Sequence, residues 1–369
     1  MADEARATGL GPAPADPTGP RQGRRSPYGP AGRSRGGFDV SGATYAALDL
    51  GTNNCRLLVA RPTRDGFRVI DAFSRIIRLG EGITASGRLS DAAMTRGVDA
   101  LRVCRGKMRN RGVTRARLIA TEACRSAANG QDFLDRVRAE VGIELEVVDR
   151  ETEALLAATG CTPLVDPNSS GVILFDIGGG SSELVRLGRT VPTPHGPPHP
   201  EVEAWVSIPM GVVTLAERHG GINVSRETFE TMIGEVAEYV DRFVAEHGGS
   251  IEGLHLLGTS GTVTTIAGVY LELPRYERRR VDGCWMSDTQ VTGVVERLLA
   301  MSYQDRVANP CIGGERADLV LAGCAILEAI RRAFPCQRLR IADRGLREGM
   351  LVQMMREDQV WDTTEQASP

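Results

Sequence analysis

A short structural device occurs twice in this chain: an apolar strand ends near an aspartate, a glycine turn follows, and a second apolar strand begins. The first copy is TYAALDLGTNNCRLLVA, residues 44–60, and the second is GVILFDIGGGSSELVRLG, residues 171–188. Glycine in such a turn lets the backbone bend sharply and approach other groups closely. Two copies in a chain of 369 residues, a length that suits two domains, predict two similar lobes.

Around these hairpins, apolar strands alternate with segments of helical periodicity, which is typical of an α/β architecture. Further strands are predicted at ARLIATEA, IELEVVD, EAWVSIPMG, GLHLLG and RLRIA. Helices are predicted after Ser90 with a stop at Gly112, after an N-cap at Asn129 to near Gly142, at ETEALLAATG, at 226–247, at the start of GTSGTV, after the Ser287–Gln290 capping box, at 316–330 and near the C-terminus.

The lobe boundaries follow from the composition along the chain. Residues 1–42 are rich in Gly, Pro, Ala and Arg and too poor in large apolar side chains to offset the entropy of ordering, which predicts a disordered tail. The first lobe is predicted at 43–165, the second at 166–344, and a flexible tail at 361–369. In the proline-rich stretch between 189 and 203, His195 and His199 are expected to be solvated loop residues rather than metal ligands.

Charge and cysteine content narrow the class of protein. A net charge of -3 argues against general nucleic-acid binding, so we expect no specific nucleic-acid partner. The eight cysteines are scattered without a C-x-x-C pair and indicate core residues in a reducing compartment. No apolar run is long enough to span a bilayer, and the N-terminus lacks the apolar core of a secretion signal, so we expect a cytoplasmic protein without membrane contact.

An aspartate at a strand end followed by glycines can hold a cation and also bring backbone N–H groups close to phosphate oxygens. One such turn alone is more often just a turn, but two in equivalent places favour a phosphate clamp between the lobes. The candidate residues are Asp49 with Gly51, Thr52, Asn53 and Asn54, and Asp176 with Gly178, Gly179, Gly180, Ser181 and Ser182.

Two other nucleotide-binding patterns are absent. No lysine lies in a glycine-rich turn, as a Walker A loop requires, and residues 49–54 do not fit the Rossmann pattern G-x-G-x-x-G. Since Lys107 is the one lysine among 44 basic residues, arginine and backbone amides must carry nearly all phosphate recognition, although this bias also fits codon usage. In GTSGTV, Gly258, Ser260 and Gly261 open a helix that either binds an anion or only packs.

Eight ordered blocks carry a more specific resemblance. They are ALDLGTNNCRLLV, RLGEGI, ATEACRSAAN, VVDRETEALLA, LFDIGGGSSELV, SIPMGVVTLAE, LLGTSGTVTTIAGV and IADRGLREGML. Over residues 44 to 355 the chain resembles the exopolyphosphatase and guanosine pentaphosphate phosphatase family, within the actin, sugar kinase and heat-shock chaperone superfamily. The resemblance implies two ribonuclease H-like lobes with a cleft between them, and a C-terminal helix at about 345–360 that returns to the first lobe.

The resemblance also implies roles for single residues. Glu153 matches a catalytic glutamate that orients or deprotonates water, and Arg125 matches an arginine that contacts phosphate. Asp176 and Glu183 match acidic residues around the metal and the water, and Asp49 matches the aspartate of the first lobe; Asp49 and Asp176 are the expected Mg²⁺ ligands, with Mn²⁺ as an alternative. Gly178 to Ser182 match the second phosphate turn.

Each implied role has a plainer structural alternative. Glu153 would be favourable near any helix N-terminus, Arg125 could form a surface ion pair, and Glu183 could be a strand residue facing solvent. Two departures from the family pattern bear on substrate choice. Asn54 replaces the serine of many relatives, and the long C-terminal helical extension of larger members is absent from this sequence.

The sequence therefore predicts an exopolyphosphatase that releases orthophosphate from inorganic polyphosphate by metal-assisted in-line attack of water. The alternative with the same fold is a guanosine pentaphosphate 5′-phosphatase. Alternatives of other classes are a polyphosphate or nucleotide phosphotransferase and a nonenzymatic nucleotide-binding regulator, since sugar kinases share the two aspartate turns. The oligomeric state is not readable from the sequence, and a homodimer is compatible with it.

Overall fold

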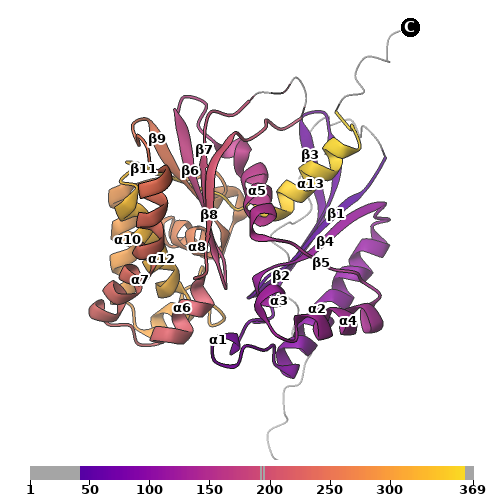
Figure 1. The fold of residues 1–369 in the computed structure, drawn as a ribbon, viewed down its shortest axis with the longest axis horizontal. Coiled ribbons are helices and arrows are strands. Elements are labelled where there is room, and N and C mark those ends of the chain that lie inside the picture. The colour runs from indigo at the N-terminus through magenta and orange to yellow at the C-terminus, as the bar shows by residue number, and fades with distance from the viewer. Residues whose placement is uncertain (1–41, 192, 194–195, 362–369) are drawn as a thin grey trace, which may run out of the picture.

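The computed structural model describes residues 42–191, 193 and 196–361. Two α/β lobes lie side by side, and the chain passes from the first lobe to the second and finally back (Figure 1). Residues 1–41 of the predicted N-terminal tail, residues 362–369 of the predicted C-terminal tail and His195 lie outside the described residues. Trp361, with which the second tail was predicted to begin, is buried in the first lobe, where its Nε1 donates to the carbonyl of Thr63. His199 is described and pairs with Val191 through a β-bridge, in which the two backbones exchange hydrogen bonds.

The first lobe contains a five-stranded sheet in the order β3-β2-β1-β4-β5. Its strands are β1 (Tyr45–Leu50), β2 (Asn54–Thr63), β3 (Gly66–Ile76), β4 (Arg115–Ala120) and β5 (Glu146–Val147). Its helices are α1 (Ile83–Ser86), α2 (Asp91–Asn110), α3 (Glu122–Ser126), α4 (Gly130–Val141) and α5 (Arg150–Cys161), which the 3₁₀ turn η1 (Thr162–Leu164) follows. α2 and α4 bury their apolar faces against β1 and β2 on one side of this sheet.

The second lobe contains a six-stranded sheet in the order β10-β11-β9-β6-β7-β8. Its strands are β6 (Gly171–Ile177), β7 (Ser182–Leu187), β8 (Val202–Ile208), β9 (Leu254–Thr259), β10 (Trp285–Ser287) and β11 (Arg338–Ile341). Its helices are α6 (Val212–His219), α7 (Arg226–His247), α8 (Ser260–Tyr270), α9 (Arg278–Val281), α10 (Asp288–Ala300), α11 (Tyr303–Ala308) and α12 (Val320–Ala333), and α13 (Leu346–Glu357) ends the described chain.

The two sheets share one topological core. In each, three successive strands form an antiparallel meander, and a later strand pairs in parallel with the first strand of the meander. Asp49 on β1 is paired across the sheet with Arg56, and Asp176 on β6 is paired with Glu183. The two aspartates therefore occupy equivalent positions, one in each lobe.

Several helix boundaries predicted from the sequence are confirmed. Ser90 caps α2, α7 spans 226–247, and Ser287 forms the capping box with Gln290 at the start of α10. Asn129 precedes α4 but does not cap it, because its side-chain amide bonds both the N–H and the carbonyl of Leu89. That amide joins two segments that are 40 residues apart, a tertiary pairing that a local cap pattern does not reveal.

Other predicted elements differ in extent. The strand predicted at IELEVVD is reduced to the two residues of β5, and the end of ARLIATEA forms the start of α3. The apolar helix predicted at 316–330 begins later, as α12 over 320–333. β3 and the short helices α1, α9 and α11 were not predicted, because they lack a strong periodic pattern.

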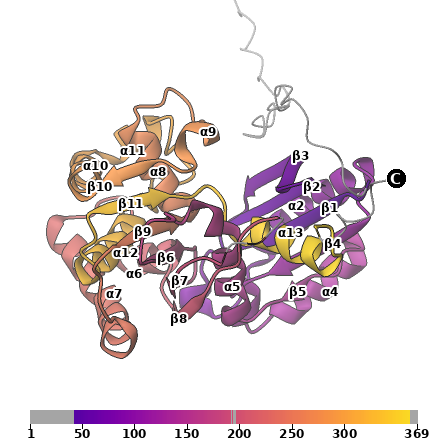
Figure 2. The ribbon, with the colours of Figure 1, turned by 90° about the horizontal axis from the view of Figure 1, so that it is seen from above.

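Helices α5 and α13 lie between the two sheets (Figures 1 and 2). The apolar face of α13 packs on the sheet of the first lobe, where Met350 and Met355 contact the cluster around Tyr45. α5 contributes Ala154 and Ala158 to the cluster that covers the sheet of the second lobe. The last helix thus packs against the first lobe.

The backbones of α5 and α13 approach each other closely at two glycines. A Cβ atom on Gly160 would lie 1.9 Å from the carbonyl oxygen of Gly345, and one on Gly349 would lie 1.9 Å from that of Leu156. Both distances are far below a van der Waals contact, so glycine is required at both positions.

Hydrogen bonds away from α5 and α13 also join the two lobes. The Arg78 guanidinium donates to both carboxylate oxygens of Asp318, at 3.0 Å each, and the N–H of Gly82 donates to Glu217 at 2.7 Å. Arg78 holds a φ of 46°, a left-handed conformation that is uncommon for residues other than glycine. The N–H group of Arg78 donates to the carbonyl of Asn53, so this backbone helps to hold the first glycine turn.

No helix in the described part of the chain combines the length and the apolar content that spanning a membrane requires. All eight cysteines are free thiols, and all but Cys284 are buried. They contribute to the cores as small apolar residues, as the sequence predicted.

We expect Gly160→Ala to destabilise the protein strongly, because the added methyl group collides with backbone that cannot move without separating α5 from α13. Forced overpacking usually costs about 1–3 kcal/mol, with larger losses where backbone must shift. Gly234→Ala is the matched control: this exposed glycine in α7 has open space around it, and the change should stabilise by about 0.5–1 kcal/mol. Urea unfolding of both variants tests this, and equal midpoints would contradict the packing argument.

Candidate active site

Three strands of the structure end in Asp-x-Gly at the junction of the lobes. β1 ends with Asp49 before Gly51, and β6 ends with Asp176 before Gly178. The short strand β11 is followed by Asp343, Arg344 and Gly345, which lead directly into α13. The third copy was not recognised in the sequence, because it leads into a helix rather than into the second strand of a hairpin.

The first glycine turn is fixed by its own backbone and by the segment after β3. The N–H of Gly51 donates to the carbonyl of Asn54 at 2.9 Å, which closes the turn. The carbonyl of Thr52 accepts from Gly80 at 2.8 Å, and that of Asn53 accepts from Arg78 at 3.1 Å. These bonds occupy the carbonyls and hold the turn in a single conformation.

The second glycine turn is held against the start of α6 and lies in contact with the first. Val212 and Val213 donate their N–H groups to the carbonyls of Gly178 and Gly179, at 3.0 and 2.8 Å. A Cβ atom on Gly179 would lie 2.9 Å from the Thr52 Cβ, and one on Gly180 would lie 2.9 Å from the Thr52 Oγ1. Glycine at these positions is what lets the turns of the two lobes meet.

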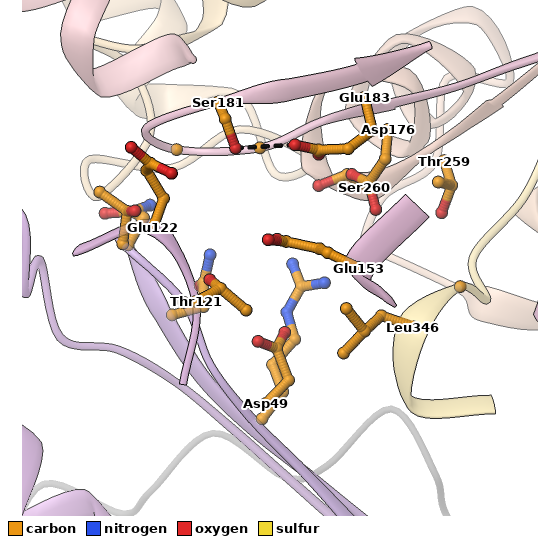
Figure 3. Close-up of a pocket in the computed structure, with 18 of the residues that line it drawn as sticks. Asp49, Thr121, Glu122, Glu153, Asp176, Ser181, Glu183, Thr259, Ser260 and Leu346 are labelled. Atoms are coloured by element: carbon orange, nitrogen blue, oxygen red, sulfur yellow. Dashed lines mark hydrogen bonds between the residues drawn. The ribbon is translucent and has the colours of Figure 1, made fainter. Parts of the chain in front are cut away.

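A cavity of about 770 Å³, open to solvent, lies between the turns. Side chains from both lobes point into it, with Glu153 of α5 near its centre between Asp49 on one side and Glu183 on the other (Figure 3). Its lining comprises Asp49, Gly51, Thr52, Asn53, Asn54, Arg56, Thr121, Glu122, Glu153, Asp176, Gly178, Gly179, Gly180, Ser181, Glu183, Thr259, Ser260, Asp343, Arg344, Gly345, Leu346 and Arg347.

Most of the residues singled out in the sequence meet in this cavity. Of the candidate catalytic, metal and phosphate residues, four do not line it: Arg125, Ser182, Gly258 and Gly261. Ser182 is buried and donates to the carbonyl of Met210, and Gly258 lies inside β9. Gly261 lines an adjoining pocket, and Arg125 donates to Glu122 and Glu153, which do line the cavity.

Several lining residues were not predicted, among them the three arginines Arg56, Arg344 and Arg347. Arg56 could have been found from its position, because two residues flanking a tight hairpin turn pair across the strands and Asp49 is its partner. Arg344 and Arg347 belong to the block IADRGLREGML, whose charged residues follow a half-buried strand. Charges in such a place need partners, which is a signal of a site.

Among the described residues, the cavity wall carries twice as many acidic as basic side chains. Burial raises the pKa of Asp176 to about 6, although the charge of Arg56 opposes the rise. Burial raises the pKa of Glu183 to about 7, and the charge of Asp176 adds to it. Ser181 and Ser207 donate to the Glu183 carboxylate at 2.8 and 3.0 Å and counteract part of that rise.

The pKa values of Glu153 and Asp49 are also raised. For Glu153 the causes are burial and then the charge of Glu183, while Arg125 acts in the opposite direction. For Asp49 the cause is burial, which Arg56 and Arg347 partly offset. Carboxylates with raised pKa values that cluster in a cleft are typical of a functional site.

The Arg125 guanidinium is fully engaged. Its Nε and Nη2 atoms donate to Glu122 at 3.1 and 2.5 Å, and its Nη1 donates to the carbonyl of Val148 at 2.6 Å. Both Nη atoms also donate to Glu153 at 3.3 Å. All five N–H groups of the guanidinium are used in this way.

The donor set of the cavity fits a hard divalent cation. Asp49 and Asp176 supply carboxylate oxygens, and the Oδ1 atoms of Asn53 and Asn54 are buried without a hydrogen-bond partner. Within the part of the chain that is described, no three His, Cys, Asp or Glu side chains form a ready-made ligand cage. Mg²⁺ suits such a site, because it usually binds one or two carboxylates and completes its shell with water and substrate phosphates.

A smaller pocket adjoins the cavity on the side of α8 and α12. It shares Asn53, Asn54, Gly178, Gly179 and Ser260 with the cavity, and Arg316 lies in its wall. Its other walls include the apolar side chains of Val212, Leu319 and Val320. An apolar wall beside polar turns can receive a flat ring that is attached to a phosphate chain.

Comparison with known proteins shows which family has a similar sequence. A sequence model of the Ppx/GppA phosphatase family matches residues 58–358. A guanosine-5′-triphosphate,3′-diphosphate pyrophosphatase of Aeromonas hydrophila is 28% identical over 308 residues, which cover 83% of this chain and 58% of that protein. The chain thus spans less than two thirds of the length of this curated relative.

Solved structures agree with the sequence comparison. The Ppx/GppA family member of Aquifex aeolicus superposes with a TM-score of 0.71 at 25% identity, covering 86% of this chain and 98% of that one. An exopolyphosphatase-like protein superposes with a TM-score of 0.77 at 27% identity, covering 86% and 99%. These matches confirm the predicted fold class of two ribonuclease H-like α/β lobes, and they show that the chain belongs to the Ppx/GppA phosphatase family.

Proposed function

We propose that this chain is a metal-dependent phosphoanhydride hydrolase that removes the terminal phosphate of guanosine pentaphosphate. The observation that carries the proposal is the contact between the two glycine turns, which brings Asp49 and Asp176 into one cavity with Glu153. Turn amides and arginines can bind phosphate oxygens there, and a carboxylate is at hand for water. The A. hydrophila relative is named for the guanosine substrate, which favours it over polyphosphate.

Inorganic polyphosphate is the second candidate substrate, and it was the first choice on the sequence alone. The exopolyphosphatase-like structure matches this chain over 99% of its own length, so its architecture is equally short. The adjoining pocket with Val212, Leu319 and Val320 weighs the other way, since a polyphosphate chain offers no apolar group to such a wall.

In the proposed reaction, the chain's own residues position water and the terminal phosphoryl group in line. The oxygen of water forms a bond to the terminal phosphorus while the bond from phosphorus to the bridging oxygen breaks, and the water proton passes to the Glu153 carboxylate. Arg56, Arg347 and the amides of the second turn stabilise the charge that develops on the phosphoryl oxygens. Asp49 and Asp176 would hold Mg²⁺ or Mn²⁺, which when bound neutralises phosphate charge.

The sizes of the barrier reductions indicate that electrostatic stabilisation supplies most of the rate enhancement. Enzymes typically lower a reaction barrier by about 8–23 kcal/mol, whereas a general base supplies about 10²–10⁴-fold in rate. The remainder must come from charged and dipolar groups fixed before the reaction begins.

Phosphate release by the full chain tests the reaction and the substrate. We expect the purified protein with Mg²⁺ or Mn²⁺ to convert guanosine pentaphosphate to the tetraphosphate with a higher kcat/KM than it shows for polyphosphates of defined length. A reversed preference would favour the exopolyphosphatase. ATP formation from polyphosphate and ADP without free phosphate would identify a phosphotransferase, and tight nucleotide binding without phosphate release under either metal would identify a regulator.

Glu153→Gln should lower kcat by about 10²–10⁴-fold, because the amide cannot accept the proton from water. Asp176→Asn should be at least as damaging, since electrostatic positioning supplies more of the rate than the base does. Glu151→Gln, an exposed acid in the same first turn of α5, is the matched control and should stay within about twofold of the parent. Near-normal turnover by a folded Glu153→Gln protein would reject the assignment.

The crowded carboxylates predict an unusual pH dependence of stability in the metal-free protein. The pKa of Glu183 is about 7 in the folded state against an ordinary 4.5, so the folded state binds more protons than the unfolded state between these values. The contribution of this group to stability is therefore fully present below pH 4.5 and is lost as the pH rises through about 7.

Thermal unfolding in a chelator checks this sign. Glu183→Gln should raise the unfolding temperature relative to the parent at about pH 8 and make no difference at about pH 4. Mg²⁺ should raise the unfolding temperature of the parent more at the higher pH, because the metal favours ionised carboxylates. A parent and a variant with parallel pH curves would show that burial does not perturb this carboxylate.

A further inference from the structure

Four charged side chains form an alternating chain at the edge of the cavity, and three of them have no role in the reaction described above. The order is Arg150, Glu122, Arg125, Glu153, with each guanidinium between or beside carboxylates. Glu122 lies at the start of α3 and lines the cavity, where its Cγ would be 3.0 Å from a Cβ on Gly180. Arg150 lies at the start of α5.

The distances within this chain are unequal. Glu122 accepts from Arg125 at 2.5 and 3.1 Å, whereas Glu153 accepts from the same guanidinium at 3.3 Å twice. Arg150 donates to Glu122 at 3.2 and 3.4 Å. Arg125 is therefore held chiefly by Glu122, and its contact with the proposed base is the looser one.

We propose that Glu122 is a positioning residue that keeps the Arg125 guanidinium from forming a tight ion pair with Glu153. Arg150 is the cation with which Glu122 pairs when Arg125 moves toward a phosphate. The inference rests on the proposed function, because it assigns Glu153 the acceptance of a proton. A carboxylate in a tight bidentate pair with arginine is a poor proton acceptor, since the pair favours its ionised form.

Loss of the Glu122 charge and loss of the Arg150 charge should have different consequences. Without the Glu122 charge, Glu153 is the remaining carboxylate for a guanidinium that donates in a fixed fork, so the Arg125–Glu153 pair tightens. Without the Arg150 charge, Glu122 has Arg125 as its single arginine among the contacts described for it, so Arg125 becomes harder to withdraw toward substrate. The first change weakens the base, and the second weakens substrate binding.

Steady-state kinetics of Glu122→Gln and Arg150→Gln in the full chain separate these consequences. We expect Glu122→Gln to lower kcat about tenfold or more with KM within about twofold, since proton transfer to a base is worth 10²–10⁴-fold and only part of it is lost. Arg150→Gln should raise KM about two- to fivefold with little change in kcat, as a partly exposed ion pair allows. Glu122→Asp restores the charge and should recover most of the lost kcat.

Glu151→Gln is again the matched control, because it removes an acid from the same turn of α5 outside the network. A merely structural role for Glu122 predicts a lower unfolding temperature, parallel losses in both variants, or no rescue by aspartate, and any of these results would overturn the inference. If Glu153→Gln retains turnover, the proposed function fails; if Glu153→Gln is inactive and Glu122→Gln behaves as the parent, only the role of Glu122 fails.

Discussion

The chemistry of this cleft depends on one close contact, in which the Thr52 side chain of the first lobe lies against the backbone of Gly179 and Gly180 in the second. A side chain at either glycine would hold the lobes apart, and the two strand-end aspartates would then lie in separate solvated hairpins. With glycine there, the carboxylates of both lobes line one cavity. Burial in that cavity raises the pKa values of Asp49 and Asp176.

The arrangement of α5 and α13 keeps that contact in place. The two helices fill the space between the sheets, and their closest approach is made of backbone at Gly160 and Gly349, which side-chain rearrangement cannot relax. α5 carries Glu153 in its first turn, and α13 begins where the third Asp-x-Gly segment leaves the cavity. The packing of one helix pair thus positions the proposed base and one wall of the site together.

The sequence was most informative where a local pattern determines structure. The hairpins of Asp49 and Asp176 could be predicted because strand, turn and strand are contiguous. The partners of long charged side chains could not, because they are chosen by tertiary geometry. The sequence did not reveal that the donors of Arg125 contact a residue three positions away and others 23 and 28 positions away, and its expected contact with phosphate stays a prediction. The aspartate after β11 was missed for another reason: the strand before it was predicted, but its Asp-x-Gly leads into a helix and so does not repeat the pattern of strand, turn and strand.

The two lobes share one strand topology but carry different charges beside their turns. This difference makes the two sides of the cleft electrostatically unequal. Across the sheet from Asp49 stands Arg56, so the first turn is balanced, whereas the partner of Asp176 is Glu183, so the second turn carries excess negative charge. Burying the excess negative charge of the second turn between the lobes costs free energy, which a cation bound there would offset. By linkage, a cation that binds both turns stabilises the closed lobes by the same free energy with which closing tightens its binding. The Arg78–Asp318 pair favours closing independently of that charge, so the lobes need not rely on the cation alone to meet.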